Sequence, residues 1–311
     1  MSKINAQGNT IWVKTAGSSN IDEGTAVAVD AQGNVYATGF YSGTASFGNQ
    51  NITVAGNTDA FLVKYNNAGN LIWVVSAGGN DSDKAKSVAV DAAGNVYISG
   101  SYINSATFGN ITVNCSGPGV FLAKYNSAGQ IQWVRSSTGA ASASGNDIAL
   151  SGTTVYMVGN FSYSITFGTV TLESANPRPP IQGFVVAYDN SGLGQSWFYG
   201  CAADASGNVF IAGKFDSNIQ LDAVSVSTSG LQDAIFIKYN SAGVIQWAKA
   251  CGGATGHEGA VDIKVSLNQV YAAGFFSNIS SFGMFTLAPN GGGSDIFVTS
   301  LEISTGNFTS A

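Results

Sequence analysis

The chain repeats its own sequence. Residues 87–100 restate residues 26–39 almost one for one, and residues 121–133 restate residues 61–73. An aromatic residue in one phase of the repeat recurs at intervals of 50 to 64 residues, at Trp12, Trp73, Trp133, Trp197, Trp247 and Phe308. Repetition at this period is typical of chains that stack one supersecondary unit many times, such as solenoids and propellers.

The sequence pattern of each repeat predicts four short strands, which we call A, B, C and D in chain order. Strand A is a Val-Ala-Val run, strand B contains Asn-Val-Tyr, strand C ends in Lys-Tyr, and strand D carries the tryptophan. Asp-x-x-Gly-Asn joins A to B and Asn-x-Ala-Gly joins C to D, and both supply the positive φ of a tight hairpin turn. No segment has a helical apolar period. A repeat of four strands predicts one blade of a β-propeller.

The segments 87–100, 121–133 and 233–247 resemble the SBBP-type β-propeller repeats of bacterial secreted and surface proteins. The resemblance covers nearly the whole chain. It implies a propeller fold, but that family has no single established activity to carry over.

We therefore predict an all-β fold, a single domain over residues 1–311 that forms a five-bladed β-propeller of four-stranded antiparallel blades. The predicted blades are 17–76, 77–136, 137–199, 200–250 and 251–302, the last completed by residues 8–16. The N-terminal strand around Trp12 is expected to pair beside residues 295–301 and so to close the ring, which would remove open sheet edges. The alternative is that the chain is a fragment of a larger ring.

One junction between blades is short. Only 7 residues separate Trp197 from Asp204, against 18 between Trp12 and Asp30. Since a strand advances about 3.3 Å per residue, such a connection has little slack. We expect the outer strand at 197–199 to pair irregularly.

Composition narrows the choice of partners. Charged residues make up 10% of the chain, the net charge is −6, and the 12 basic residues form no cluster. Binding to a nucleic-acid backbone is not expected, because it needs convergent positive charge. No stretch approaches the roughly 20 apolar residues of a membrane span. Residues 1–7 have no apolar core of a secretory signal.

Metals and cofactors are not expected either. His257 is the single histidine, which argues against a histidine-cluster metal site and weakens a catalytic triad. Cys115, Cys201 and Cys251 are odd in number and lack metal-like spacing, so we interpret them as small hydrophobic residues.

Candidate binding residues gather where the inner strands begin, which in propellers is the top face. Asp147 and Asp262 hold one equivalent position, and Lys264 stands where the other repeats have alanine. An unpaired buried ammonium is costly, so Lys264 should contact Asp262, Asp147 or Glu258. Aromatic residues at the end of strand B are candidates for ligand stacking. The predicted ligand-binding residues are Asp147, Asp262, Lys264, His257, Glu258, Tyr41, Tyr102, Tyr163 and Phe276.

The sequence favours a non-enzymatic binding or scaffold propeller of a bacterial surface, secreted or particle-associated protein. Insertions between strands B and C should enlarge the top face into a polar rim that recognises protein or glycan. One alternative is a lectin-like propeller with a shallow carbohydrate site in each blade. Another is a glycoside-acting enzyme with two carboxylates about 5–10 Å apart in a central pocket. No residue is assigned as catalytic, and the ligand and the oligomeric state stay open.

Overall fold

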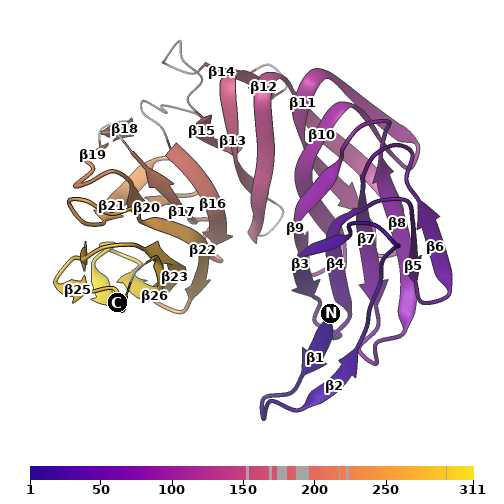
Figure 1. The fold of residues 1–311 in the computed structure, drawn as a ribbon, viewed down its shortest axis with the longest axis horizontal. Helices are drawn as coiled ribbons and strands as arrows, with labels where there is room; N and C mark the ends of the chain where they lie inside the picture. Colours follow the sequence, from indigo (N-terminus) through magenta and orange to yellow (C-terminus); the bar gives the residue numbers. More distant parts are fainter. Residues whose placement is uncertain are drawn as a thin grey trace. The chain divides into compact units, whose positions relative to one another are not determined.

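The computed structural model describes residues 1–151, 154–167, 170–173, 181–186, 196–216, 218–221, 224–291 and 293–311 (Figure 1). All regular secondary structure in these ranges is β-strand. The described part contains no helix that is long and apolar enough to cross a membrane. The chain divides into two compact units, Met1–Gly139 and Ala140–Ala311.

The N-terminal unit begins with a hairpin and continues with two repeats. The hairpin is β1 (Ser2–Ile4) and β2 (Thr10–Val13). Repeat 1 is β3 (Glu23–Val29), β4 (Val35–Tyr41), β7 (Asp59–Tyr65) and β8 (Leu71–Gly78), with an inserted hairpin of β5 (Thr44–Phe47) and β6 (Gln50–Thr53). Repeat 2 is β9 (Lys84–Val90), β10 (Val96–Phe108), β11 (Ile111–Tyr125) and the first part of β12 (Ile131–Ser151). Both repeats are antiparallel, with sequence neighbours paired in the order A-B-C-D.

The C-terminal unit holds the other three repeats. Repeat 3 contains the end of β12, β13 (Thr154–Phe167), β14 (Val170–Glu173) and β15 (Ile181–Val186). Repeat 4 is β16 (Ser196–Ala203), β17 (Val209–Phe215), β20 (Asp233–Tyr239) and β21 (Ile245–Cys251), with β18 (Ile219–Leu221) and β19 (Val224–Val226) inserted. Repeat 5 is β22 (Gly259–Ser266), β23 (Gln269–Phe276), β26 (Asp295–Glu302) and β27 (Phe308–Ser310), with β24 (Ser280–Phe282) and β25 (Phe285–Leu287) inserted. Repeats 4 and 5 are each a four-stranded sheet.

The A–B turns form as their sequence predicts. The Asp30 carboxylate accepts hydrogen bonds from the backbone N–H groups of Gln32 and Asn34, at 3.0 and 2.8 Å. Gly33 has a φ of 78°, which favours glycine. The same arrangement recurs at Asp91 and Asp204, so these aspartates serve the turn.

The recurring tryptophans join consecutive repeats. Trp73 of repeat 1 donates from Nε1 to the carbonyl of Ser127 in the C–D turn of repeat 2, at 3.2 Å. Its ring fills the space above Gly129, where a Cβ would lie 2.9 Å from ring atom Cδ2. Trp247 holds repeat 5 in the same way, through Ile303. Trp73 and Trp247 thus pack between neighbouring repeats.

Apolar faces of neighbouring sheets form the cores. Tyr36 and Leu62 of repeat 1 share one buried cluster with Val88 of repeat 2. Phe236 of repeat 4 shares another with Ile263 of repeat 5. At these two joints, therefore, facing sheets of consecutive repeats bury each other's apolar residues, as in other stacked architectures.

The predicted pairing of the N-terminal strand is wrong. Residues 8–16 were expected beside β26, but β27 occupies that edge, with Leu301 opposite Phe308. The two strands are joined by a local turn, which closes at lower entropic cost than a contact with the start of the chain. Strand β2 instead pairs with β1, with Lys3 opposite Trp12, just as Lys64 lies opposite Trp73. The chain thus starts with a C–D hairpin, which the sequence analysis missed.

Trp197 is also out of the predicted phase. It lies in β16 opposite Lys214 and belongs to strand A of repeat 4, so the assignment of 197–199 to an outer strand is wrong. The irregular pairing expected there is present, because the register shifts between Phe198 and Gly200. The spacing explains the place in strand A, because Trp197 precedes Asp204 by 7 residues just as Glu23 precedes Asp30. Residues 187–195, where the outer strand of repeat 3 is then expected, lie outside the described residues.

Candidate functional site

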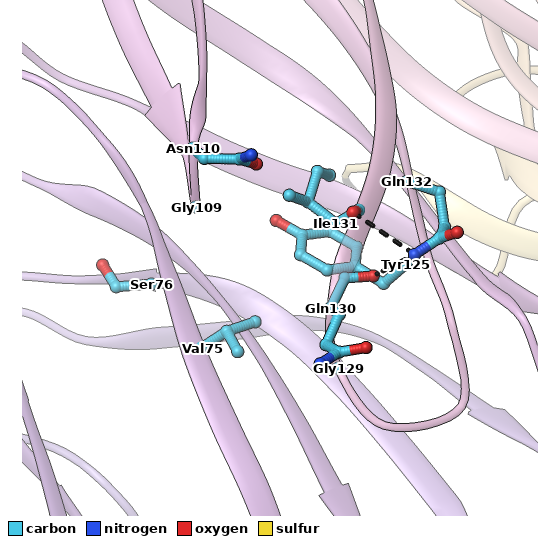
Figure 2. Close-up of a pocket in the computed structure, with 9 residues that line it drawn as sticks. All are labelled: Val75, Ser76, Gly109, Asn110, Tyr125, Gly129, Gln130, Ile131 and Gln132. Atoms are coloured by element: carbon cyan, nitrogen blue, oxygen red, sulfur yellow. Dashed lines mark hydrogen bonds between the residues drawn. The ribbon is translucent and has the colours of Figure 1, made fainter.

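A groove lies at the joint between repeats 1 and 2, and we call it the joint groove (Figure 2). Its volume is about 620 Å³. It is bordered by the end of β8, the tip of the β10–β11 hairpin and the turn between β11 and β12. Its lining residues are Val75, Ser76, Gly109, Asn110, Tyr125, Gly129, Gln130, Ile131 and Gln132.

The inserted hairpin is held against this groove by an aromatic anchor. Phe108 is buried and its ring lies 4.8 Å from that of Phe121. Gly109 follows with a φ of 60°, and a Cβ there would lie 2.9 Å from Ile131 Cγ2. The same Phe-Gly tips occur at Gly48 and Gly283.

The tips therefore lie next to the strands that follow the C–D turns. Gly48 faces Leu71 and Gly283 faces Phe308, the first residues of their outer strands. The same hairpins also lie against the segments before strand A. Ser46 exchanges backbone hydrogen bonds with Gly17 before repeat 1, and Ser281 does so with Gly252 before repeat 5. The buried Phe108 thus anchors its hairpin on Phe121 of its own repeat, and it also pairs with Ala77 in β8 of repeat 1.

The joint groove is lined by uncharged polar groups. Asn110, Gln130 and Gln132 present amides, and no lining residue is acidic, basic or histidine. Gln132 donates from Nε2 to the carbonyls of Gln130 and Ile131, at 3.2 and 3.3 Å, which holds its side chain along the turn (Figure 2). Burial raises the pKa of Tyr125, whose hydroxyl has no hydrogen-bond partner. Such a surface can bind a neutral polar ligand through its amides.

The predicted ion pair of Lys264 is present. Lys264 Nζ lies 2.9 Å from Asp262 Oδ1. The side chains are 68% and 53% exposed, so the expectation of a crowded, buried ammonium is wrong. Burial alone would lower the pKa of Lys264, but Asp262 and Asp147 outweigh it and the pKa is raised.

Asp147 and Asp262 lie on either side of β16. Asp147 Oδ2 accepts a hydrogen bond from the Cys201 N–H at 2.9 Å. On the other side, a Cβ on Gly200 would lie 2.9 Å from the Cα of Asp262. Three of the predicted site residues, Asp147, Asp262 and Lys264, thus come together within the C-terminal unit.

The other two charged candidates have separate roles. Glu258 is buried and accepts a hydrogen bond from Ser280 Oγ at 2.9 Å, and burial raises its pKa. His257 is exposed, and its backbone N–H donates to Ser277 Oγ at 2.8 Å.

Three of the predicted stacking residues are core residues. Tyr41, Tyr102 and Phe276 are buried, so their rings are not available to a ligand. The hydroxyl of Tyr102, for example, donates to the carbonyl of Ser137. In repeat 3 this position is taken by the buried Phe161, which the sequence alignment misplaced by two residues. Tyr163 is 48% exposed and has a φ of 67°.

Sequence reasoning missed the joint groove and the buried partner of Glu258. The only signal for the groove was the Phe-Gly pair before Asn110. The partner of Glu258 is Asp233, and both carboxylates lie against Gly252. The same arrangement of two acids against a glycine recurs at Gly78, at the end of repeat 1.

No family model matches the chain, and so the resemblance to SBBP repeats has no support from one. The chain is 23% identical over 315 residues to an uncharacterized WD repeat-containing protein of Acanthamoeba polyphaga mimivirus, covering 88% of the chain and 19% of that protein. It is 27% identical over 312 residues to the regulatory protein FlaEY of Caulobacter vibrioides, covering 88% of the chain and 32% of that protein. The chain spans about a fifth and a third of these relatives. A WD repeat is a propeller blade, which fits the four-stranded repeats described above.

Proposed function

We propose that the chain is a non-enzymatic β-propeller scaffold that binds a neutral polar ligand, a glycan or an uncharged protein segment, in the joint groove. The observation that carries this proposal is the lining of the groove, where three amide side chains and no carboxylate, lysine, arginine or histidine border a hollow of about 620 Å³. Amides both donate and accept hydrogen bonds, as hydroxyl-rich sugars and peptide backbones require.

The names of the relatives support a scaffold rather than an enzyme. One is described by its WD repeats and the other as a regulatory protein. We further propose a surface, secreted or particle-associated location in bacteria. The support is a chain with 10% charged residues that relies on Asn, Ser, Thr and 40 glycines for its polar surface.

We also propose that the five repeats close into a ring through their sheet faces. In repeat 5, Ile296 and Val298 are 84% and 64% exposed, whereas their counterparts Ala60 and Leu62 are buried. In repeat 1, Val27 is 60% exposed, whereas its counterpart Val88 is buried. Ala60 and Leu62 on one side and Val88 on the other form the interface that joins repeat 1 to repeat 2. The exposed residues of repeat 5 and repeat 1 are therefore the counterparts of its two sides.

Ring closure is tested by a disulfide between Val27→Cys and Ile296→Cys. A cross-linked chain that stays monomeric by light scattering is the expected result. The control pairs Val27→Cys with Val244→Cys, an exposed position in a C–D turn. Cross-linking only between chains, or equal yields from the two pairs, would contradict closure.

Binding is tested with a glycan array, a library of uncharged peptides and a panel of glycosidase substrates. Gln132→Ala should abolish binding of the ligand that the arrays identify. Gln246→Ala is the matched control, because Gln246 holds the equivalent place and also donates to a turn carbonyl, that of Val244, at 3.1 Å. Equal losses in both variants would instead favour a lectin with one site per repeat. Turnover of a glycosidic substrate would overturn the non-enzymatic proposal.

A further inference from the structure

Two buried carboxylates meet at the joint between repeats 1 and 2. Asp59 begins β7 of repeat 1, and Asp83 precedes β9 of repeat 2. They are 3% and 1% exposed. Both lie against Gly78, where a Cβ would be 2.4 Å from Asp59 Oδ1 and 2.9 Å from Asp83 Oδ2.

The joint between repeats 4 and 5 repeats this arrangement. Asp233 and Glu258 are 1% and 0% exposed. A Cβ on Gly252 would lie 2.3 Å from Asp233 Oδ1 and 2.9 Å from Glu258 Oε2. The two pairs sit in different units of the chain, so each is an independent example of the same geometry.

The acid pair and its glycine are absent together at the end of repeat 2, whereas Gly17 and Asp22 before repeat 1 have the glycine and the second acid. At the end of repeat 2 the aligned positions are Gly119, Thr138 and Ala143. The register supports this alignment, because Phe121 lies opposite Ser136 as Phe61 lies opposite Ser76. The repeat therefore folds without the pair, and the pair is a feature added to two joints.

One oxygen in each pair lacks a hydrogen-bond donor. Asp59 Oδ1 and Asp233 Oδ1 are buried and accept no hydrogen bond. The other Asp59 oxygen accepts from the Ala55 N–H at 2.9 Å, and Asp83 Oδ2 accepts from the Gly79 N–H at 2.7 Å. A buried, ionised oxygen without a donor beside a second carboxylate is strongly unfavourable.

A proton resolves this conflict better than a metal ion does. Calcium takes six to eight oxygen ligands. Among the described residues, no group of three or more His, Cys, Asp or Glu side chains could hold a metal ion. A carboxyl group beside a carboxylate needs only one proton, as in other sites that two carboxylates share.

We propose that each pair, Asp59 with Asp83 and Asp233 with Glu258, binds one proton and in that form holds two consecutive repeats together. Loss of the proton leaves two like charges buried at the joint, and the joint then opens more readily. The pairs are thus a pH-sensitive device built into two of the joints.

The direction of the pH effect follows from burial. Burial raises the pKa of Asp83 from 3.8 to about 6, and nearby Asp59 and Asp81 add to the shift. Burial also raises the pKa values of Asp59 and Glu258. Because the folded pKa of Asp83 lies above its ordinary value, the stabilisation by proton binding is complete below pH 3.8 and is lost as the pH rises through about 6.

Other titratable groups lie near the two acid pairs, but they do not explain a loss of stability as the pH rises through about 6. Tyr41 and Tyr102 lie near the first pair and Cys251 lies between the acids of the second, and burial raises all three pKa values. Asp81 flanks the first pair, and its carboxylate accepts a hydrogen bond from Asn104 Nδ2 at 2.8 Å. Lys214 lies beside the second pair and bonds Gln232 Oε1 at 3.3 Å. His257 precedes Glu258 in the chain but is exposed.

The test is the urea unfolding midpoint of the full chain between pH 4.5 and 7.5. The wild type should be more stable at the acid end. Asp83→Asn combined with Glu258→Gln should be more stable than the wild type at pH 7.5 and should lose most of this pH dependence. Glu173→Gln, which neutralises an exposed acid of repeat 3, is the control and should keep the wild-type dependence.

Two results would overturn the proposal. One is a double variant with the same pH dependence as the wild type. The other is calcium chloride at pH 7.5 raising the midpoint of the wild type but not of the double variant, because the pairs would then be cation sites. If the double variant does not fold, Asp59→Asn is used, which keeps Asp83 and should weaken the pH dependence by about half.

Discussion

Repeats 1 and 2 are built on the same four strands but differ where strand C begins. Repeat 1 has Asp59 there, with Gly78 opposite, whereas repeat 2 has Gly119 and Thr138. Gly78 has no positive φ, so its backbone does not require glycine. It is glycine because the Asp59 carboxylate occupies the space of a side chain. In a repeat protein, a glycine can therefore mark a close neighbour rather than a turn.

The second difference is what covers each C–D turn. Trp73 of repeat 1 covers the turn of repeat 2, while Trp12 of the N-terminal hairpin covers the turn of repeat 1. Trp73 also lies 6.2 Å from the buried ring of Tyr36. Trp12 has only the ring of Tyr65 nearby, at 6.5 Å, among the described aromatic contacts.

Replacing these tryptophans should have the largest effect. Trp73 is half-buried, and Trp73→Ala removes packing on both repeats of a joint. We expect a loss of about 2–3 kcal/mol of unfolding free energy, at or below the lower end of the range for fully buried aromatic residues. Trp12→Ala removes a cover at one side of a hairpin and should cost about 1 kcal/mol. Urea denaturation measures both. Equal losses would show that the hairpin is as firmly joined to repeat 1 as repeat 1 is to repeat 2.

The glycine comparison should give a comparable effect. Gly78→Ala places a methyl group 2.4 Å from Asp59 Oδ1 and should cost about 2–3 kcal/mol. Thr138→Ala, at the aligned exposed position in repeat 2, should change the unfolding free energy by less than about 0.5 kcal/mol.

A double variant sharpens this result. In an Asp59→Ala background, Gly78→Ala should lose most of its cost, because the crowded carboxylate is gone. Additive losses would mean that Gly78 is required by its backbone conformation, and the explanation given above would be wrong.

Hydrogen exchange can compare the joints locally. The Gly79 N–H donates to the ionisable Asp83 at 2.7 Å, whereas the Val120 N–H of repeat 2 donates to the neutral Ser137 Oγ at 2.8 Å. The raised pKa of Asp83 predicts that protection at Gly79 falls by about tenfold from pH 5 to 7.5 after correction for intrinsic rates, which is about 1.4 kcal/mol. Protection at Val120 should not change. A parallel fall at both amides would mean global unfolding.

The sequence was sufficient for the features that depend on local pattern. The turn aspartates, the positive-φ glycines and the four strands per repeat follow from short segments such as residues 87–100. It failed where position in the repeat had to be inferred from one residue type. Trp197 was aligned on its ring alone, although its spacing to Asp204 matches strand A.

The candidate sites were harder to predict because they depend on contacts between distant segments. Strands β7 and β8 and a joint between repeats lie between Asp59 and Asp83 in the chain. Neither segment contains a sequence feature that indicates its contact with the other. The buried Tyr41 and Tyr102 were taken for ligand contacts because an aromatic residue at a strand end has the same sequence signature on the surface as in the core. Pairing of acids with a glycine, present in two repeats and absent together in a third, was the available signal.

The smallest effect is expected where repeats 1 and 2 agree and repeat 5 departs from them. Ala28 and Ala89 occupy the position of Lys264, so Lys264→Ala restores the residue of the other repeats. The Lys264–Asp262 pair is mostly exposed, and such pairs contribute about 0–1 kcal/mol. We expect Lys264→Ala to change the unfolding free energy by less than about 0.5 kcal/mol.

Lys264→Glu should cost more, about 1 kcal/mol, since Asp262 and Asp147 then face a like charge. Adding 0.5 M salt should reduce the loss in Lys264→Glu, because exposed charges are screened over a few ångströms. If Lys264→Ala instead lowered the unfolding free energy by several kcal/mol, the lysine would belong to a desolvated polar centre. Its four alanine counterparts would then not show which residues this position accepts.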